Sequence, residues 1–363
     1  CADVMWRMDE ALEAYDKAIM WSKSDASKQA VLINQSAVYV QLGRFEKAKR
    51  YAKRALEIDD TARKARHNMG VSLLAERNWA EGWKYYRGSL GSGNRLHWKY
   101  ADEPDWDGSP GKVVVISGEQ GIGDEINAAA MLEDAIRVSK RVIVDCDKRL
   151  KGLFQRSFPM AKVYGTRNEK ALDWDEADRM PDASMAAMQI GEFFRTRAED
   201  FSGKPYLVAD PERVSMWRHL WAQKSKPVIG LAWTGGIEST GASFRKWALK
   251  DMQPLFDAID AHWVCLQYKD ASKEIEGTPI VQYPYATLTS DYDDTAALVA
   301  SLSGVVAMDT SVVHLAGALG VPCAVGVPKA ANWRWGEKHE TQPWYNSVKI
   351  FRQGDAWPWD AIV

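Results

Sequence analysis

The pattern of apolar positions divides the chain into two regions with different periods. Over roughly the first 90 residues, apolar side chains recur at helical spacing among strong helix formers, without a strand-like run. A stretch rich in Gly, Pro and Asp comes next, at 91–111. Short apolar runs then alternate with helical segments, at 112–117, 141–145, 228–233, 262–266, 304–308 and 323–327. This alternation predicts an α/β protein in which two parallel sheets face each other across a cleft, preceded by an all-α segment.

The helical region contains an internal repeat. Ala48 and Gly82 occupy equivalent places and lie 82 − 48 = 34 residues apart, which is the tetratricopeptide period. Ser36 and Gly70 fall at the small-residue position of the first helix of each repeat. We count one trailing helix and two repeats, too few for a free-standing solenoid, so we expect the array to dock on the α/β domains. Its recurring aromatic residues are expected to pack rather than to bind ligand: Tyr15, Phe45, Tyr51, Trp79 and Tyr86.

Composition narrows the class of protein only mildly. The net charge is −2, with 47 basic and 49 acidic residues, which gives no general signal for nucleic acid. The chain lacks an apolar run of transmembrane length and a signal-peptide layout, so we expect a cytoplasmic protein. Cys146, Cys265 and Cys323 sit in apolar runs and match neither a zinc pattern nor a disulfide framework.

The stretch 305–327 carries the clearest candidate site. An apolar run ends in Asp309-Thr310-Ser311, and a small-residue helix follows with His314 in its first turn. The first N–H groups of such a helix carry partial positive charge, so the turn is a natural site for an anion such as a diphosphate. His314 could add a proton or a hydrogen-bond donor there. An ordinary capped helix with a buried histidine is the alternative.

A glycine-rich turn, Gly118 to Asp124, follows the first strand. It does not match a P-loop, and Asp124 places a negative charge where a dinucleotide pyrophosphate would have to sit. We favour a turn in which Gly121 and Gly123 let an acceptor approach the backbone while Asp124 projects into the cleft as a base. A simple helix cap remains the alternative for Asp124.

Two further groups of charged residues bear on the chemistry. Asp145-Cys146-Asp147 has the D-x-D form that can hold a divalent cation, although it also suits a helix start. Arg245 and Lys246 could neutralise a departing diphosphate, or could form a solvated basic pair. An aromatic and basic cluster, 332–336, follows the last predicted strand.

Residues 106–353 resemble the ADP-heptose:lipopolysaccharide heptosyltransferase superfamily, most closely the bacterial branch in which tetratricopeptide repeats precede the transferase. The matching stretches occur in order along both strand series: GEQGIGDE, CDKRLKGLFQRSFP, VIGLAWTGG, CLQYKD, DYDDTAALVASLSGVVAMDTSVVHLAGALGVP, NWRWG and PWYNSVKIFRQ. The resemblance implies two facing Rossmann-like domains, the GT-B arrangement. We expect repeat helices at 1–95, a linker at 96–111, an acceptor domain at 112–226 and a nucleotide-sugar donor domain at 227–363.

The resemblance also implies residue roles and a metal-independent reaction without a cofactor. Asp124 falls on the family's catalytic Asp and Lys246 on its phosphate-binding Lys, whereas Ser311 stands where the family usually has Gly. Gly121 and Gly123 belong to the acceptor-side loop. The expected donor-binding residues are Trp233, Arg245, Lys246, Gln267, Asp309, Thr310, Ser311 and His314.

Two classes of function remain open. In the first, the protein is a glycosyltransferase that moves a hexose or heptose from a nucleotide-diphosphate sugar to a hydroxyl of a glycan or protein acceptor. In the second, it is a non-catalytic module that binds a nucleotide sugar or a protein. The repeats could hold the acceptor, act as a structural cap or mediate homo-oligomer formation.

Overall fold

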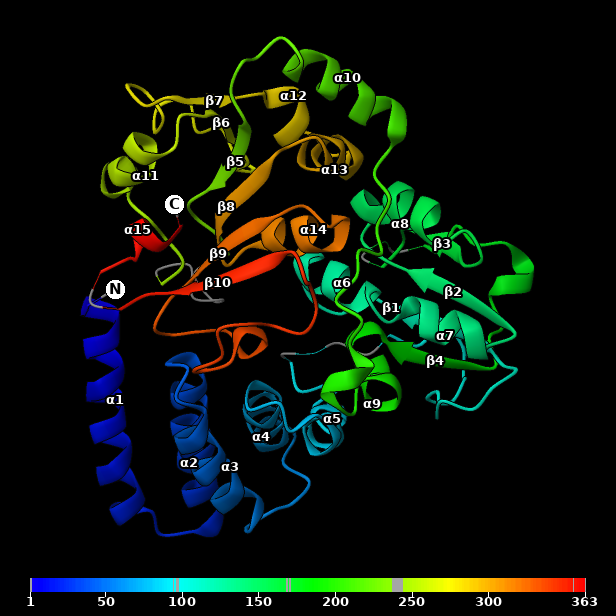
Figure 1. Cartoon of the computed structure of the whole chain (residues 1–363). Coiled ribbons are helices and arrows are strands. Elements are labelled where there is room, and N and C mark those ends of the chain that lie inside the picture. The colour runs from blue at the N-terminus through cyan, green and yellow to red at the C-terminus, as the bar shows by residue number, and fades with distance from the viewer. Residues whose placement is uncertain are drawn as a thin grey trace.

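The computed structural model describes residues 2–93, 95, 98–167, 169, 171–236, 244–354 and 356–362. Residues 237–243, a polar stretch shortly before Arg245, lie outside these ranges. Figure 1 shows three parts: the blue helices α1–α5, a first sheet with its helices, and a second, larger sheet with its own. None of the helices in the described ranges is long and apolar enough to cross a bilayer.

The N-terminal part is a row of helices packed on their neighbours. The helices are α1 (Ala2–Trp21), α2 (Asp25–Gln41), α3 (Phe45–Leu56), α4 (Arg63–Ala75) and α5 (Trp79–Arg87). Small residues allow paired helices to touch: the Ser36 hydroxyl donates to the Ala48 carbonyl at 2.8 Å. A side chain at Gly70 would come within 2.6 Å of the Tyr86 nitrogen. These two residues therefore set the spacing of the pairs α2–α3 and α4–α5.

The first sheet is parallel, with the order β3-β2-β1-β4. Its strands are β1 (Val113–Ser117), β2 (Arg141–Asp145), β3 (Lys162–Tyr164) and β4 (Ala183–Ala186). The associated helices are α6 (Ile122–Ala129), α7 (Leu132–Val138), α8 (Lys151–Ser157) and α9 (Gly191–Phe194). The strand order reverses between β1 and β4. The glycine turn that follows β1 therefore lies at the switch point where α/β sheets bind ligands.

The second sheet is also parallel, with the order β10-β9-β8-β5-β6-β7. Its strands are β5 (Val228–Ala232), β6 (His262–Cys265), β7 (Ile280–Gln282), β8 (Gly304–Met308), β9 (Cys323–Val327) and β10 (Val348–Arg352). The associated helices are α10 (Pro211–Trp221), α11 (Gln253–Ala258), α12 (Pro284–Thr287), α13 (Tyr292–Ala300), α14 (Ser311–Leu319) and α15 (Trp359–Ile362). Its switch point lies between β5 and β8, and the Asp309 turn follows β8.

Helix α10 belongs with the second sheet, ahead of the boundary expected at residue 227. It packs on α13, and the Trp221 indole N–H donates to the Ser301 hydroxyl at 2.8 Å. Arg213 of the same helix forms ion pairs with Asp291 and Asp294 at 2.8 and 2.6 Å. We therefore propose that the second Rossmann-like unit begins with α10.

The repeat helices pack against both Rossmann-like units. The Trp83 indole N–H donates to the Arg195 carbonyl at 2.8 Å, and Trp83 is fully buried. Arg95, beyond the last repeat helix, forms a buried ion pair of 2.6 Å with Glu119 of the glycine turn. Gly43, between α2 and α3, lies close to the backbone of residues 329–331. A side-chain carbon added at Gly43 would come within 2.9 Å of the Ala331 nitrogen. The expected docking of the array is therefore present.

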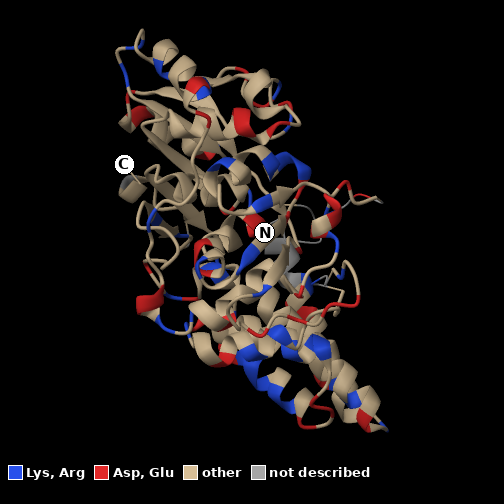
Figure 2. Cartoon of the chain, turned by 90° about the vertical axis from the view of Figure 1, so that its right-hand side faces the viewer, with Lys and Arg blue, Asp and Glu red and all other residues tan. Residues whose placement is uncertain are grey.

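The surface carries charges of both signs. Lys and Arg are mixed with Asp and Glu on the side of the molecule shown in Figure 2, in keeping with the net charge of −2.

Candidate functional site

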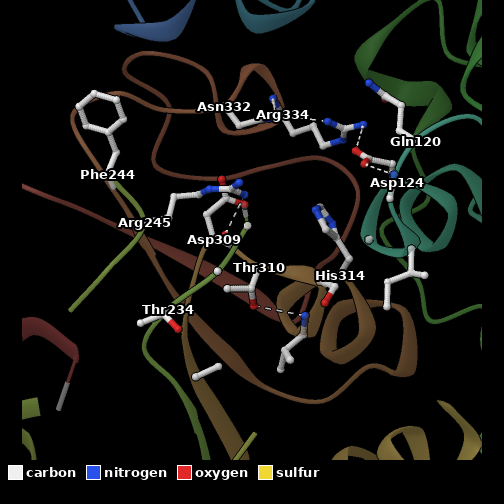
Figure 3. A pocket seen from close by; sticks show the side chains of 18 of the residues that line it. Gln120, Asp124, Thr234, Phe244, Arg245, Asp309, Thr310, His314, Asn332 and Arg334 are labelled. Atoms are coloured by element: carbon white, nitrogen blue, oxygen red, sulfur yellow. Dashed lines mark hydrogen bonds and ion pairs between the residues drawn. The ribbon is translucent and has the colours of Figure 1, made fainter. Parts of the chain in front are cut away.

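A cavity of about 1150 Å³ lies where the three parts of the chain meet. Its walls come from the glycine turn before α6, the start of α14, the segments after β5 and β6, and the repeat helices. Figure 3 shows the part of the wall formed by the glycine turn, the segment after β5 and the start of α14. Pockets for single small ligands usually have volumes of about 300–1,000 Å³. This cavity is therefore larger than the usual pocket for one small ligand.

Helix α14 begins at the cavity wall. Thr310 is its N-cap residue, with extended backbone angles, and the Thr310 hydroxyl accepts a hydrogen bond from the Val312 N–H at 3.3 Å. Gly235, after β5, lies against this turn, because an added side-chain carbon there would overlap the Thr310 methyl group. Ser311 also lines the cavity. The hydroxyls and the positive end of the helix thus meet at the switch point of the second sheet.

His314 lies one turn into the same helix and is buried at the cavity wall. Its Nδ1 atom is 3.0 Å from the Tyr345 hydroxyl, and its ring stacks on Trp335 with centroids 5.7 Å apart. Burial lowers the pKa of His314 to about 3, and the guanidinium groups of Arg334 and Arg245 act in the same direction. His314 is therefore a neutral imidazole at physiological pH.

Asp124 faces α14 from the first Rossmann-like unit, in the third position of α6. One carboxylate oxygen accepts the Gly121 N–H at 3.0 Å, which is a helix-capping contact. The other forms an ion pair with Arg334 at 2.8 Å. Asp124 thus caps α6 and also lines the cavity, while its role as a base stays a prediction.

The two glycines of this turn differ in what they contact. A side-chain carbon at Gly123 would come within 3.0 Å of the Ser311 Cα atom, whereas one at Gly121 would meet only an Asp124 oxygen at 3.4 Å. Gly123 therefore permits close packing of α6 on α14. Gly121 and Gly123 both line the cavity, so the approach of an acceptor to this backbone stays a prediction.

Arg245 and Arg334 supply positive charge to the cavity. Arg245 donates to the Asp309 backbone carbonyl at 3.3 Å. Burial raises the pKa of the Asp309 carboxyl, and the nearby Arg245 guanidinium opposes that shift. The Asp309 carboxyl therefore lies beside the Arg245 guanidinium, and its backbone carbonyl helps to position that side chain.

Two expected donor residues do not belong to the described cavity lining, Lys246 and Trp233. Lys246 is exposed and pairs through its backbone with Thr234, so the alternating strand geometry turns its side chain away while Arg245 turns inward. Trp233 is buried in a hydrophobic core, and its indole N–H donates to Glu274 at 2.9 Å. Gln267 does line the cavity, where its amide donates to the Thr234 hydroxyl.

The D-x-D residues make structural contacts. The Asp145 carboxylate accepts hydrogen bonds from the Thr166 N–H at 2.8 Å and from the Tyr100 hydroxyl at 2.9 Å. Asp147 caps the following turn and pairs with Arg149 at 2.9 Å. Within the described ranges, no group of three or more His, Cys, Asp or Glu side chains is arranged to hold a metal ion.

Sequence reasoning missed part of the site. Arg334 lies in the aromatic and basic cluster at 332–336, but its approach to Asp124 depends on how the two sheets face each other. The repeat helices also contribute to the cavity wall, through Met8, Val40, Gln41 and Val71. Tyr86, expected only to pack, is buried beside Trp333 at the same wall. A helical repeat gives no local signal of which face an adjoining domain will cover.

Comparison with known proteins finds matches both for the repeat helices and for the two sheets with their helices. The tetratricopeptide repeat model matches residues 30–61, which include most of α2 and all of α3. The crystal structure of a glycosyl transferase family 9 protein from Veillonella parvula aligns with 73% of this chain and 90% of its own, at a TM-score of 0.50 and 10% identity. The two Rossmann-like units form a GT-B fold.

The chain is also similar to a curated protein and to a further solved structure. Protein FlbA of Caulobacter vibrioides is 30% identical over 318 residues, which is 77% of this chain. This chain spans 50% of the length of that curated relative. The E. coli ADP-heptose lps heptosyltransferase II structure aligns with 67% of this chain and 92% of its own, at a TM-score of 0.44 and 13% identity. The chain is thus a tetratricopeptide-repeat segment joined to a module with the GT-B fold.

Proposed function

We propose that the protein transfers a sugar from a nucleotide-diphosphate sugar to a hydroxyl group of a glycan or protein acceptor. The observation that carries this proposal is the meeting of Asp124 with the start of α14 in one cavity between two Rossmann-like units. The GT-B fold adds support, because it is shared with a glycosyl transferase of family 9.

The donor diphosphate would lie against the start of α14. The helix N-terminus and the hydroxyls of Thr310 and Ser311 suit an anion, and Arg245 and Arg334 can compensate its charge. When the bond from the sugar's anomeric carbon to the diphosphate oxygen breaks, its electron pair stays on the diphosphate. Donors fixed in place before the reaction stabilise that developing charge. We propose Arg245, rather than Lys246, as the cation supplied by the segment after β5.

Asp124 would act as the general base. As the acceptor oxygen forms its bond to the anomeric carbon, its proton passes to the Asp124 carboxylate. The contacts with the Gly121 N–H and with Arg334 orient this carboxylate, and each oxygen retains a lone pair for the incoming hydroxyl. Helices α6 and α14 pack directly on each other, and this contact holds Asp124 facing the start of α14.

We further propose that the acceptor enters along the repeat helices. The cavity extends from Asp124 to Val71 of α4 and to Gln41 and Met8 at the far wall. Repeat arrays commonly use their concave surface to bind extended ligands. An acceptor lying there would place its hydroxyl between the repeat helices and the donor sugar.

The reaction is proposed to need no metal ion, since helix α14 and the two arginines can hold the diphosphate. The test is incubation with a panel of nucleotide sugars, with release of nucleoside diphosphate measured with and without EDTA. Release with one donor, unchanged by EDTA, is the expected result. Inhibition by EDTA that manganese reverses would instead favour a metal site at Asp145 and Asp147.

The non-catalytic alternative draws on one observation, the ion pair between Asp124 and Arg334 with the capping contact to Gly121. These contacts would serve a purely binding module equally well. Calorimetric binding of a nucleotide sugar without nucleotide release, with water or with any acceptor of the panel, would favour this alternative.

A further inference from the structure

A chain of buried hydrogen bonds runs from Arg334 to His314 across the two Rossmann-like units. The Arg334 Nε–H donates to the Asn127 side-chain oxygen at 2.9 Å. The Asn127 amide in turn donates to the Tyr345 hydroxyl oxygen at 3.0 Å. The Tyr345 hydroxyl is 3.0 Å from Nδ1 of His314. Asn127 comes from α6 of the first unit, and the other three residues come from the second.

The direction of each hydrogen bond follows from the chemistry of the first donor. An arginine side chain can only donate, so the oxygen of the Asn127 amide must face it and the NH₂ group must face Tyr345. The Tyr345 oxygen therefore accepts, and its single hydrogen remains to be donated. The neighbouring Tyr206 hydroxyl lies farther away, at 3.4 Å, and donates its own hydrogen to the Ile126 carbonyl at 2.7 Å. The hydrogen of Tyr345 therefore points to His314.

A neutral imidazole that accepts at Nδ1 carries its hydrogen on Nε2. His314 lines the cavity, and Figure 3 shows its ring extending from α14 between Asp309 and Asp124. The Tyr345 ring packs against Gly317, one turn after His314. A side-chain carbon at Gly317 would overlap that ring. The stacked Trp335 ring holds the imidazole plane.

We infer that Asn127 and Tyr345 are positioning residues that hold His314 as a neutral Nε2–H donor toward the phosphate groups of the ligand. His314 then contributes a hydrogen bond, and neither a positive charge nor a proton. This inference rests on the proposed function for its ligand, a nucleoside diphosphate. The tautomer itself is a property of the protein alone.

The first test reads the tautomer without a ligand. In protein labelled with ¹⁵N-histidine, the His314 signals are assigned by difference with the His314→Gln variant. The expected result is a protonated Nε2 and an unprotonated Nδ1 in the wild type, and a mixture of tautomers in Tyr345→Phe. A wild-type His314 protonated at Nδ1 would overturn the inference, whether or not any nucleotide binds.

The second test measures the role of Tyr345 in ligand binding. Calorimetry is performed with the nucleoside diphosphates ADP, UDP and GDP and with the matching nucleosides. Tyr345→Phe should weaken binding of the preferred diphosphate about three- to ten-fold, the effect of one hydrogen bond. Binding of the nucleoside should be unchanged. Tyr206→Phe is the matched control, because it removes a neighbouring hydroxyl that donates to the Ile126 carbonyl at 2.7 Å and lies 3.4 Å from the Tyr345 hydroxyl.

The outcomes separate the inference from the proposed function. Equal losses for diphosphate and nucleoside in Tyr345→Phe, or equal losses in the two Phe variants, would show a general packing role and overturn the inference. Failure of the wild type to bind any of the diphosphates would count against the proposed function, while the tautomer measurement would still decide how His314 is held.

Discussion

At the scale of single residues, Asp124 is the group on which turnover should depend. We expect Asp124→Asn to lower the rate of sugar transfer by about 10²–10⁴, the usual effect of losing a general base. Asparagine keeps an oxygen that can accept the Gly121 N–H, so the start of α6 should remain intact. Donor affinity should therefore be spared. Steady-state rates and calorimetry on the same variant measure the two effects.

Asp147→Asn provides the control for Asp124→Asn, because it changes the same chemical group in the same Rossmann-like unit. Its carboxylate pairs with Arg149 and caps a short turn. Transfer by this variant should stay close to that of the wild type. A loss in Asp147→Asn that matched the loss in Asp124→Asn would contradict the assignment of the base.

His314 also predicts a dependence of stability on pH. Its pKa is lowered from 6.5 to about 3 by burial, so the unfolded chain binds a proton that the folded protein does not take up between these values. Stability should therefore fall as the pH drops below about 6.5, by about 2 kcal/mol from this group at pH 5. Urea unfolding of wild type and His314→Gln between pH 5 and 7.5 measures the contribution.

The comparison with the variant is needed because other buried groups titrate in the same range. Burial lowers the pKa of His67 to about 4, which acts in the same direction as His314. Burial raises the pKa of Glu125 to about 8, which favours the folded state at low pH. The difference between the two proteins removes both contributions. A difference that did not change with pH would show that His314 is not held neutral.

At the scale of elements, the contact between α6 and α14 sets the geometry of the cavity. Gly123→Ala adds a carbon within 3.0 Å of the Ser311 backbone, so we expect a loss of about 1–3 kcal/mol in the free energy of unfolding. The neighbouring Gly121→Ala is the matched control, since its added carbon makes only an ordinary contact. Chemical denaturation measures both variants. Equal stabilities would mean that the helices can separate without cost.

The strands of the two sheets show why some elements are easier to predict than others. Strand β8 and helix α14 follow clear apolar and capping signals, and both lie where the pattern predicts them. The apolar pattern does not predict strands β3, β4, β7 and β10. The first three have only three or four residues, and β4 consists of Ala183, Ser184, Met185 and Ala186, which are buried but lack the β-branched residues that favour strands.

At the scale of the whole molecule, the repeats and the GT-B module form a continuous core. Trp83 is fully buried between α5 and the first unit, where its ring fills the space beside Gly191. Trp83→Ala should cost about 3–5 kcal/mol in the free energy of unfolding. Trp21→Ala removes the same side chain from a site that is 81% exposed, and it should change stability by less than about 0.5 kcal/mol. Thermal unfolding of both variants measures the contrast.

Deletion of residues 1–90 removes nearly the whole repeat segment, and so tests its contact with the GT-B module more severely than Trp83→Ala does. The sequence alone predicts that the truncated protein loses solubility but keeps its affinity for nucleotide. Because Val40, Gln41 and Val71 line the cavity, the structure leads us to expect that the deletion removes part of the ligand site as well. Nucleotide affinity unchanged in a monodisperse truncated protein would show that the repeats contact the acceptor side alone.

The sequence by itself determined those features that depend on neighbouring residues. Helical periodicity and small residues such as Ser36 and Gly70 defined the repeats, and apolar runs ending in polar turns defined most of the strands. The capped start of α14 with His314 in its first turn was also readable, since capping acts within a few residues. The resemblance to a transferase family added the order of the two Rossmann-like units and the prediction that Asp124 is catalytic.

Only the tertiary structure decided which of these residues face one another. It brought Arg334 to Asp124, chose Arg245 over Lys246 for the cavity, and buried Trp233 in a core. It also joined Asn127 and Tyr345, 218 residues apart, beside His314. These contacts depend on how two sheets and a row of helices pack together. Burial, direction and partner are properties of that packing, and no local pattern along the chain records them.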